Sequence, residues 1–221
     1  MSVEVVQLTG AEFDEAMEFL DGVFGEHRPH DFATLLPSIY QPTDEDMACN
    51  HAVREDGVLR AVVGLFPIDW QVGDRTLKVG GIGGVSTHPS VRGKGYMQLL
   101  MKHCVEKMRE EDYHLSWLGG QRQRYGYFGY EKCGQSLSVE LSPVNLQHAS
   151  PTVPDLRFEP IEAEDADRIA TVQRLHDAQP VRCRRKGPEF HRFLRSWYRR
   201  PHAAVDAAGA LVGYLVATED G

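Results

Sequence analysis

Apolar residues near the start of the chain recur at helical spacing. A capping box at Thr9-Gly10-Ala11-Glu12 leads into such a run, which predicts a helix over about residues 10–24. A short strand from Val3 to Leu8 precedes it. A second short helix is expected from Asp31, and it should end before Pro42 because the residue before a proline disfavours the helical backbone.

The next part of the chain is rich in extended, apolar runs. Residues 48–54 and 58–68 flank Glu55-Asp56-Gly57, and the Asp-Gly pair is typical of a hairpin turn. A second turn at Val72-Gly73-Asp74 leads into a strand over residues 76–87. These segments predict an antiparallel meander.

A strand-helix-strand crossover is expected after the meander. The run from Lys94 to Arg109 has one apolar face, and a short strand from Tyr113 to Leu118 follows it. Such a crossover joins parallel strands, so the sheet should change from antiparallel to parallel here. A turn or helix over 122–128 and a strand from Glu131 to Leu141 complete the unit. The predicted class is α/β (α+β) with a mixed sheet.

The remainder of the chain repeats the order of the opening. Residues 142–154 are rich in Pro and Ser and are predicted to be a linker between a domain of residues 1–141 and a partial second domain of residues 155–221. An offset of 151 residues places His51 on His202. The second part is expected to contain a strand over 156–161, a helix over 165–176, a basic helix over 189–199 and a hairpin over 203–218 turning at Ala208-Gly209. It therefore corresponds to the first half of a second, similar unit.

Composition and charge narrow the classes of function. The net charge is −8, and residues 151–221 hold equal numbers of basic and acidic side chains, so the acidic excess falls on residues 1–150. An acidic domain repels nucleic acid and attracts cations. The basic residues at 182–200 fit the solvated face of an amphipathic helix, so they do not indicate nucleic-acid binding either. The N-terminus lacks a basic stretch followed by an apolar core, and no apolar run reaches the roughly 18 residues that a membrane span needs, so neither a targeting segment nor a membrane anchor is expected. The four cysteines form no ligand spacing or disulfide framework, which predicts reduced thiols, no metal and a cytoplasmic setting.

The strongest chemical motif lies where the meander passes into the amphipathic helix. Arg92-Gly93-Lys94-Gly95 combines two glycines, which let a phosphate approach the backbone, with two positive charges. Unpaired N–H groups and the positive end of the helix dipole make a helix start a seat for pyrophosphate. Gly80-Gly81-Ile82-Gly83-Gly84 opens no helix and so is not a dinucleotide fingerprint, and Gly93-Lys94 lacks the spacing of a P-loop.

The motif Pro89-x-x-Arg92-Gly93-Lys94-Gly95 resembles the acetyl-CoA loop of the GNAT acetyltransferases. Met97 stands where the family usually has a small residue, a pattern similar to the enhanced intracellular survival (Eis) type, which also has tandem GNAT units. The resemblance implies an acetyl-CoA co-substrate. It assigns the contacts with this cofactor to Val85, Thr87, Arg92, Gly93, Lys94, Gly95, Tyr96 and Met97.

A second motif, Tyr125-Gly126-Tyr127-Phe128-Gly129-Tyr130, is similar to the aromatic segment that follows the fifth strand in GNAT enzymes. The resemblance places Tyr125 near the thioester sulfur. A phenol is mostly protonated at neutral pH, so Tyr125 is the predicted general acid for the departing thiolate. In the family, the strand that holds Val85 and Thr87 parts from its neighbour, and its free backbone groups bind the pantetheine arm.

The acceptor and its base are less well defined by the sequence. Glu26, on the loop after the first predicted helix, is a candidate to bind or deprotonate the amine, and His88 is an alternative base. The predicted reaction is direct transfer of an acetyl group to a primary amine in a ternary complex. The acceptor is expected to be a small-molecule or peptide amine, cationic in character, and a homo-oligomer is left open. The alternative is a non-catalytic GNAT-like module that binds acyl-CoA or a protein partner.

Overall fold

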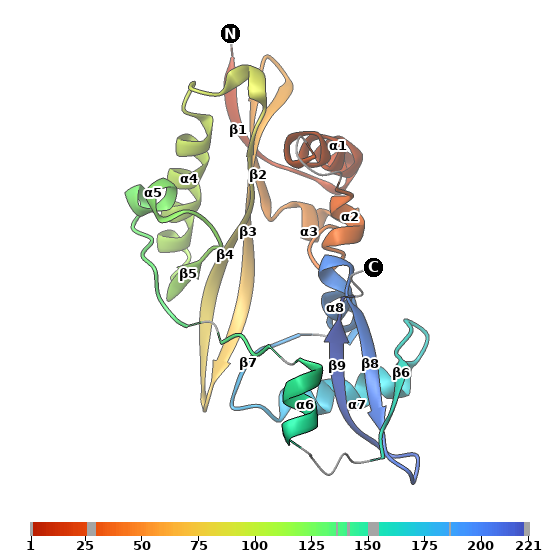
Figure 1. Cartoon of the computed structure of the whole chain (residues 1–221). Helices are drawn as coiled ribbons and strands as arrows, with labels where there is room; N and C mark the ends of the chain where they lie inside the picture. The colour runs from red at the N-terminus through yellow and green to blue at the C-terminus, as the bar shows by residue number, and fades with distance from the viewer. Residues whose placement is uncertain are drawn as a thin grey trace.

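The computed structural model describes residues 2–25, 30–135, 137–140, 142–149, 155–185 and 187–218. Within these ranges the strands form a six-stranded mixed sheet and a three-stranded antiparallel sheet, which lie beside each other in Figure 1. We call the part built around the larger sheet the first unit and the part built around the smaller sheet the second unit. Among the described residues, no helix is long and apolar enough to cross a membrane.

The larger sheet has the predicted mixed topology. Its path runs in the order β1-β2-β3-β4-β5. These strands are β1 (Val3–Gln7), β2 (Asn50–Glu55), β3 (Val58–Val72), β4 (Arg75–Thr87) and β5 (Leu115–Trp117). Neighbours are antiparallel from β1 to β4, whereas β4 and β5 are parallel. The predicted change of strand direction is therefore confirmed.

Both predicted turns of the meander are present. Asp56 and Gly57 connect β2 to β3 with φ angles of 52° and 80°. Two successive positive φ values are characteristic of the tight hairpin turn that an Asp-Gly pair favours. Gly73, with φ of 57°, turns the chain from β3 into β4.

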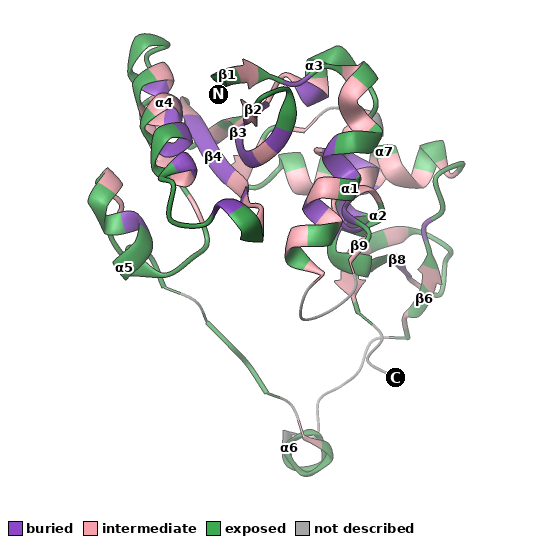
Figure 2. Cartoon of the chain, turned by 90° about the horizontal axis from the view of Figure 1, so that it is seen from above, coloured by how far each residue is buried: buried purple, intermediate pink, exposed green. Residues whose placement is uncertain are grey.

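Helices cover both faces of the larger sheet (Figure 1). One face carries α1 (Phe13–Phe24), α2 (Phe32–Leu35) and α3 (Asp44–Met47), and the other carries α4 (Tyr96–Glu110) and α5 (Arg122–Tyr125). Each face has its own apolar core, because the side chains of a strand alternate between the two sides. Figure 2 shows buried residues of β4 and α4 next to each other.

The helix boundaries differ from the predictions in two places. The helix expected from Asp31 is a single turn, and α3, which Thr43 caps, was not foreseen. The helix expected from Lys94 begins at Tyr96, because Gly95 has φ of 85° and is its N-cap. A residue with positive φ lies outside the helical backbone region.

The strand expected from Glu131 to Leu141 is wrong for the described residues of that range, 131–135 and 137–140, which form no strand. Its alternating apolar residues have no surface to cover, since Leu137 and Val139 are 91% and 82% exposed. The segment predicted to be a linker contains α6 (Pro143–Ala149), which lies apart from the packed body and is largely exposed (Figure 2).

The second unit repeats the strand arrangement of the opening. The order β6-β8-β9, with antiparallel neighbours, repeats β1-β2-β3. Its elements are β6 (Arg157–Pro160), α7 (Ala166–Asp177), α8 (Gly187–Arg195), β8 (Arg200–Val205) and β9 (Leu211–Ala217). His51 pairs with the last residue of β1, and His202 pairs with the last residue of β6. The expected strand, two helices and hairpin are therefore all present.

A short strand links the two units. β7 (Val181–Cys183) pairs antiparallel with the end of β3, where Trp70 faces Cys183. The backbone N–H of Arg184 extends this contact by donating to the Asp69 carbonyl at 2.8 Å. This pairing was not predicted, and it fixes the second unit against the far end of β3.

Candidate functional site

The loop before α4 has the backbone shape that its glycines require. Val91 is buried and anchors the loop, whereas Arg92, Gly93, Lys94 and Gly95 are exposed. Gly93 and Gly95 have φ of 91° and 85°, and nothing lies within 4 Å of a Cβ built on either. The first helical hydrogen bond runs from Leu99 N to Gly95 O, so the N–H groups of the first turn have no acceptor inside the helix. The loop can therefore present backbone donors to an anion.

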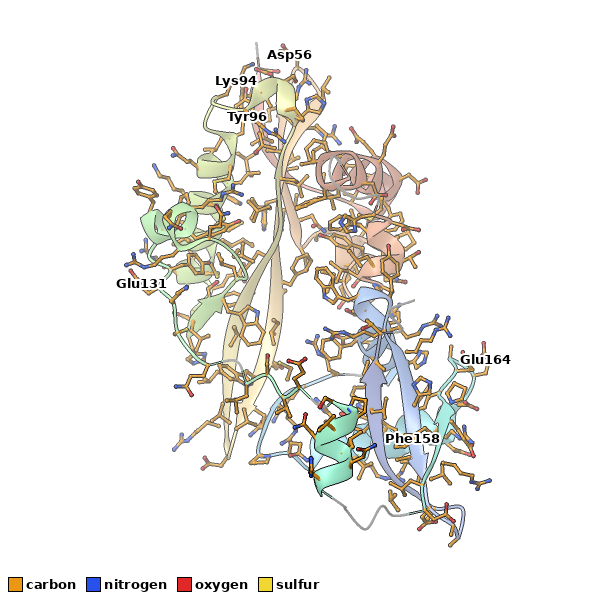
Figure 3. All side chains as sticks on the ribbon, viewed as in Figure 1. Asp56, Lys94, Tyr96, Glu131, Phe158 and Glu164 are labelled. Atoms are coloured by element: carbon orange, nitrogen blue, oxygen red, sulfur yellow. The ribbon has the colours of Figure 1, made fainter. Side chains whose placement is uncertain are left out.

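Two predicted cofactor residues contact the protein itself. Lys94 Nζ and Tyr96 Oη both donate to Glu55 Oε1 at 2.7 Å, and Arg60 Nε lies 3.8 Å from Glu55 Oε2. The hydrogen bond from Lys94 lowers the pKa of Glu55, and the same contact raises the pKa of Lys94. The cluster fixes the start of α4 to the end of β2. Figure 3 shows Lys94 and Tyr96 together at the end of the first unit that is remote from the second.

The strands β4 and β5 part in the middle of β4, several residues before this loop. Their pairing covers Val79, Gly80 and Gly81 of β4 and ends at Trp117. Beyond Gly81, β4 continues to Thr87 with no strand on that side among the described residues. Val85 and Thr87, both half-buried, lie on this open stretch. Its backbone groups are available to a ligand, as at any unpaired strand edge.

A β-bulge changes the direction of the backbone in the open stretch of β4, residues 82–87. The register between β3 and β4 shifts between Val62 and Gly64, opposite Gly84, which has φ of 58°. A Cβ at Gly84 would lie 2.6 Å from Tyr40 Oη. That hydroxyl is buried and has no hydrogen-bond partner among the described residues, and burial raises the pKa of Tyr40. Glycines inside a strand often mark a bulge. The Gly83-Gly84 pair was therefore a signal in the sequence for this bulge, which was not predicted.

Tyr125 lies at the end of α5 and is buried against Tyr130, with ring centroids 6.5 Å apart. Its hydroxyl forms no hydrogen bond to any described residue, whereas Tyr130 Oη is 2.7 Å from Ser116 Oγ. Gly120 leaves space for the Tyr125 ring, which a Cβ there would overlap. Tyr125 and Val85, two of the predicted site residues, line the same cavity.

This cavity has a volume of about 1730 Å³ and lies between the two units. The first unit contributes a mainly apolar wall and the β4 bulge, and the second unit contributes residues 177–199. Apolar lining residues of the first unit include Phe32, Leu35, Phe66, Ile68 and Trp117. Ligand pockets commonly have volumes of about 300–1,000 Å³. The space therefore admits an acceptor larger than a simple amine.

The structure describes only one of the two candidates for the general base, His88. Glu26 lies outside the described residues. His88 caps the turn at Pro89–Val91, where its Nδ1 accepts from Ser90 N at 3.2 Å and lies 2.7 Å from Ser90 Oγ. His88 does not line the cavity. Among the described residues, no group of three or more metal-ligating side chains is placed to hold a metal ion.

The family comparison agrees with this geometry. A family profile described as an acetyltransferase (GNAT) domain matches residues 4–133. This range contains the loop before α4, the open stretch of β4 and Tyr125. No curated protein matches the sequence.

Several solved structures share the fold. A probable N-acyltransferase from Enterococcus faecalis is 15% identical with a TM-score of 0.66, covering 100% of this chain and 56% of its own. A GCN5-related N-acetyltransferase from Anabaena variabilis is 16% identical with a TM-score of 0.64, covering 97% and 54%. N-myristoyltransferase from Saccharomyces cerevisiae, solved with myristoyl-CoA, is 13% identical with a TM-score of 0.58, covering 98% and 57%. The chain thus spans a little over half the length of these proteins.

Proposed function

The chain belongs to the acetyltransferase (GNAT) family, and from this premise we propose that it transfers an acetyl group from acetyl-CoA to a primary amine by direct attack in a ternary complex. The observation that carries the proposal is the parting of β4 and β5 beyond Gly81 and Trp117. The open stretch of β4 runs from the cavity to the loop before α4. A long cofactor can therefore lie along it with its reactive end in the cavity.

The contacts of the cofactor follow from this path. The pyrophosphate would accept hydrogen bonds from the exposed backbone of Gly93 and Gly95 and from the first turn of α4. The amide groups of the pantetheine arm would pair with β4 between Val85 and Thr87. Lys94 and Tyr96 then act through Glu55, by holding the loop in place.

The transfer reaction requires a proton donor at the sulfur atom of the leaving CoA thiolate. The amine nitrogen attacks the thioester carbon, the C–S bond breaks, and the thiolate accepts the Tyr125 proton. The attacking nitrogen then releases one proton to solvent, and Tyr125 regains a proton from solvent. N–H groups near the β4 bulge would stabilise the negative charge on the carbonyl oxygen. The amine loses its proton before the attack, and Glu26 stays a prediction for binding the ammonium. The cytoplasmic setting and the question of a homo-oligomer also stay predictions.

Two assays on the whole chain test the proposal. Calorimetric titration measures acetyl-CoA binding, and release of free thiol over a panel of amines measures transfer. Binding without release from any amine would favour the alternative, a non-catalytic acyl-CoA-binding module. The absence of both would overturn the proposed function.

Tyr125→Phe tests the assigned donor. We expect turnover to fall about 10²- to 10⁴-fold, the usual contribution of a general acid, while the Kd for acetyl-CoA stays unchanged. Tyr127→Phe is the matched control, because Tyr127 is two residues away and 90% exposed. Equal turnover in the Tyr125 and Tyr127 variants would remove Tyr125 from the mechanism.

A further inference from the structure

The second unit gives the cavity a basic wall, although the chain as a whole is acidic. Five arginines of this unit line the cavity, against two acidic residues of the same unit, Asp177 and Glu189. The arginines are Arg182, Arg184, Arg185, Arg192 and Arg199. The first unit adds three acidic residues to the lining, Glu45, Asp46 and Asp69, and one arginine, Arg124, so the basic charge is concentrated on the side of the second unit.

Two of these arginines have only neutral partners. Arg192 Nη1 donates to Gln41 Oε1 at 2.9 Å, and Arg184 Nη2 donates to Gln71 Oε1 at 2.8 Å. Among the described residues, neither guanidinium has a carboxylate within 4 Å, whereas Arg185 Nη1 lies 3.2 Å from Glu189 Oε1. The positive charge of Arg184 and Arg192 is therefore not neutralised within the described part of the chain.

The same wall contains buried donors that lack acceptors. The Nε atoms of Arg185 and Arg192 are buried and have no hydrogen-bond partner within the described ranges, whereas the buried Nε of Arg182 lies 3.8 Å from Asp177 Oδ1. A buried donor without an acceptor is unfavourable, and more so when it carries charge. A bound anion would supply both an acceptor and a negative charge. Arg192 combines all three properties, because it lines the cavity, lacks a carboxylate partner and has a buried, unpaired Nε.

The cavity surface between β7 and the β4 bulge is mainly apolar, although Asp69 also lines it. At one end of the interval, Gly64 of β3 pairs with Gly83, next to the β4 bulge. At the other end, six residues further along β3, Trp70 pairs with β7, the strand that carries Arg182. Six strand residues span about 20 Å. Phe66, Ile68 and Trp117 line the cavity over this interval. An acceptor that reaches from the bulge to Arg182 must therefore pass along this mainly apolar surface.

We propose that the acceptor amine carries an anionic group at the end of an apolar spacer, and that Arg192 with its neighbouring arginines binds this group. The inference rests on the proposed function and refines its substrate class. The amine end is an ammonium ion in solution, in agreement with the cationic acceptor expected from the acidic first unit, and the opposite end is negative. Carboxylates and phosphates share the required chemistry, because a guanidinium binds either through charge-assisted hydrogen bonds.

The competing explanation is purely structural. Arg192 also joins the two units through its hydrogen bond to Gln41. Gln41→Ala breaks the same bond but keeps the charge of Arg192. The two roles are therefore separable by experiment.

The test uses linear ω-aminocarboxylates of increasing length, each paired with the 1-alkylamine and the diamine of equal length. Transfer from acetyl-CoA gives kcat/KM for each compound. We expect kcat/KM for the longer aminocarboxylates to exceed that for the matched alkylamine by about tenfold or more, the effect of one charge-assisted contact. Aminoalkyl phosphates of the same lengths distinguish the two anions.

The variants locate the preference. In Arg192→Gln the ratio of carboxylate to alkylamine kcat/KM should fall to near one, whereas Arg195→Gln, an exposed arginine on the same helix, should keep it. Gln41→Ala should also keep it. Equal rates for the two compound classes in the unaltered chain, a preference for diamines, or loss of the ratio in Gln41→Ala would overturn the proposal.

A binding measurement separates this inference from the proposed function. Trp117 and Trp197 line the cavity, so tryptophan fluorescence reports binding without turnover. If no amine is acetylated, the transfer function fails. The anion site is still supported if aminocarboxylates bind more tightly than alkylamines and Arg192→Gln removes the difference. It is refuted if both compound classes bind alike.

Discussion

Lys94 Nζ lies 2.7 Å from Glu55 Oε1, and this contact fixes the loop before α4 to the end of β2. The lysine of the sequence motif therefore contacts a carboxylate of the same chain. We expect Glu55→Gln to weaken acetyl-CoA binding about three- to tenfold, because the loop loses a charge-assisted bond and becomes less ordered. Calorimetric titration gives the Kd.

A double-mutant cycle decides how Lys94 acts. If Lys94 acts through Glu55, Lys94→Met and Glu55→Gln have similar effects and their combination is not additive. If the ammonium instead contacts phosphate, Lys94→Met weakens binding much more and the two effects add. Arg109→Gln, near the opposite end of α4, removes one positive charge far from the loop and is the control.

Local signals in the sequence were sufficient for most of the first unit. The turn at Asp56-Gly57 and the crossover through α4 depend on residues close together in the chain, and both were predicted. The contact between Lys94 and Glu55 joins residues 39 positions apart in the chain, and no local sequence pattern indicates it. β7 has only three residues, too few for a clear alternation of apolar and polar side chains, so its pairing with β3 could not be predicted either. That pairing places Arg182 at the wall of the cavity.

Gly84 is constrained by both its backbone and its surroundings. Its φ of 58° strains any residue with a Cβ, and that Cβ would lie 2.6 Å from Tyr40 Oη. We expect Gly84→Ala to lower the free energy of unfolding by about 1–3 kcal/mol or more. Gly22→Ala is the matched control, because Gly22 lies in α1 with nothing within 4 Å of its Cβ, and alanine there should stabilise by about 0.5–1 kcal/mol. Urea unfolding measures both, and equal effects would contradict the constraint.

Tyr40 has a buried hydroxyl with no hydrogen-bond partner in the described part of the chain, although its ring packs against Phe32 and Phe66. Tyr40→Phe keeps the ring and removes the unsatisfied group. We expect the free energy of unfolding to stay equal or to rise by up to about 1–3 kcal/mol. Thermal unfolding measures the change. A clear loss of stability would mean that the hydroxyl has a partner in solution.

His51 makes the stability of the first unit dependent on pH. The residue is buried in β2, and His103 Nε2 lies 3.2 Å from its Nδ1. Burial, and to a lesser extent His103 and Lys107, lowers the pKa of His51 to about 4, while Glu111 acts in the opposite direction. An unfolded histidine has a pKa of about 6.5. The unfolded chain therefore binds a proton at this residue before the folded chain does.

The sign of the effect follows from this order. The contribution of neutral His51 to stability is complete above pH 6.5 and is lost as the pH falls toward 4, because protonation then favours the unfolded chain. Between pH 7 and pH 5 we expect His51 to account for a loss of about 2 kcal/mol in the free energy of unfolding. Urea unfolding at both pH values should show this loss reduced by that amount in His51→Gln. His202→Gln, at the equivalent position of the second unit, should keep the full pH dependence, and an identical pH dependence in both variants would show that His51 is not the titrating group.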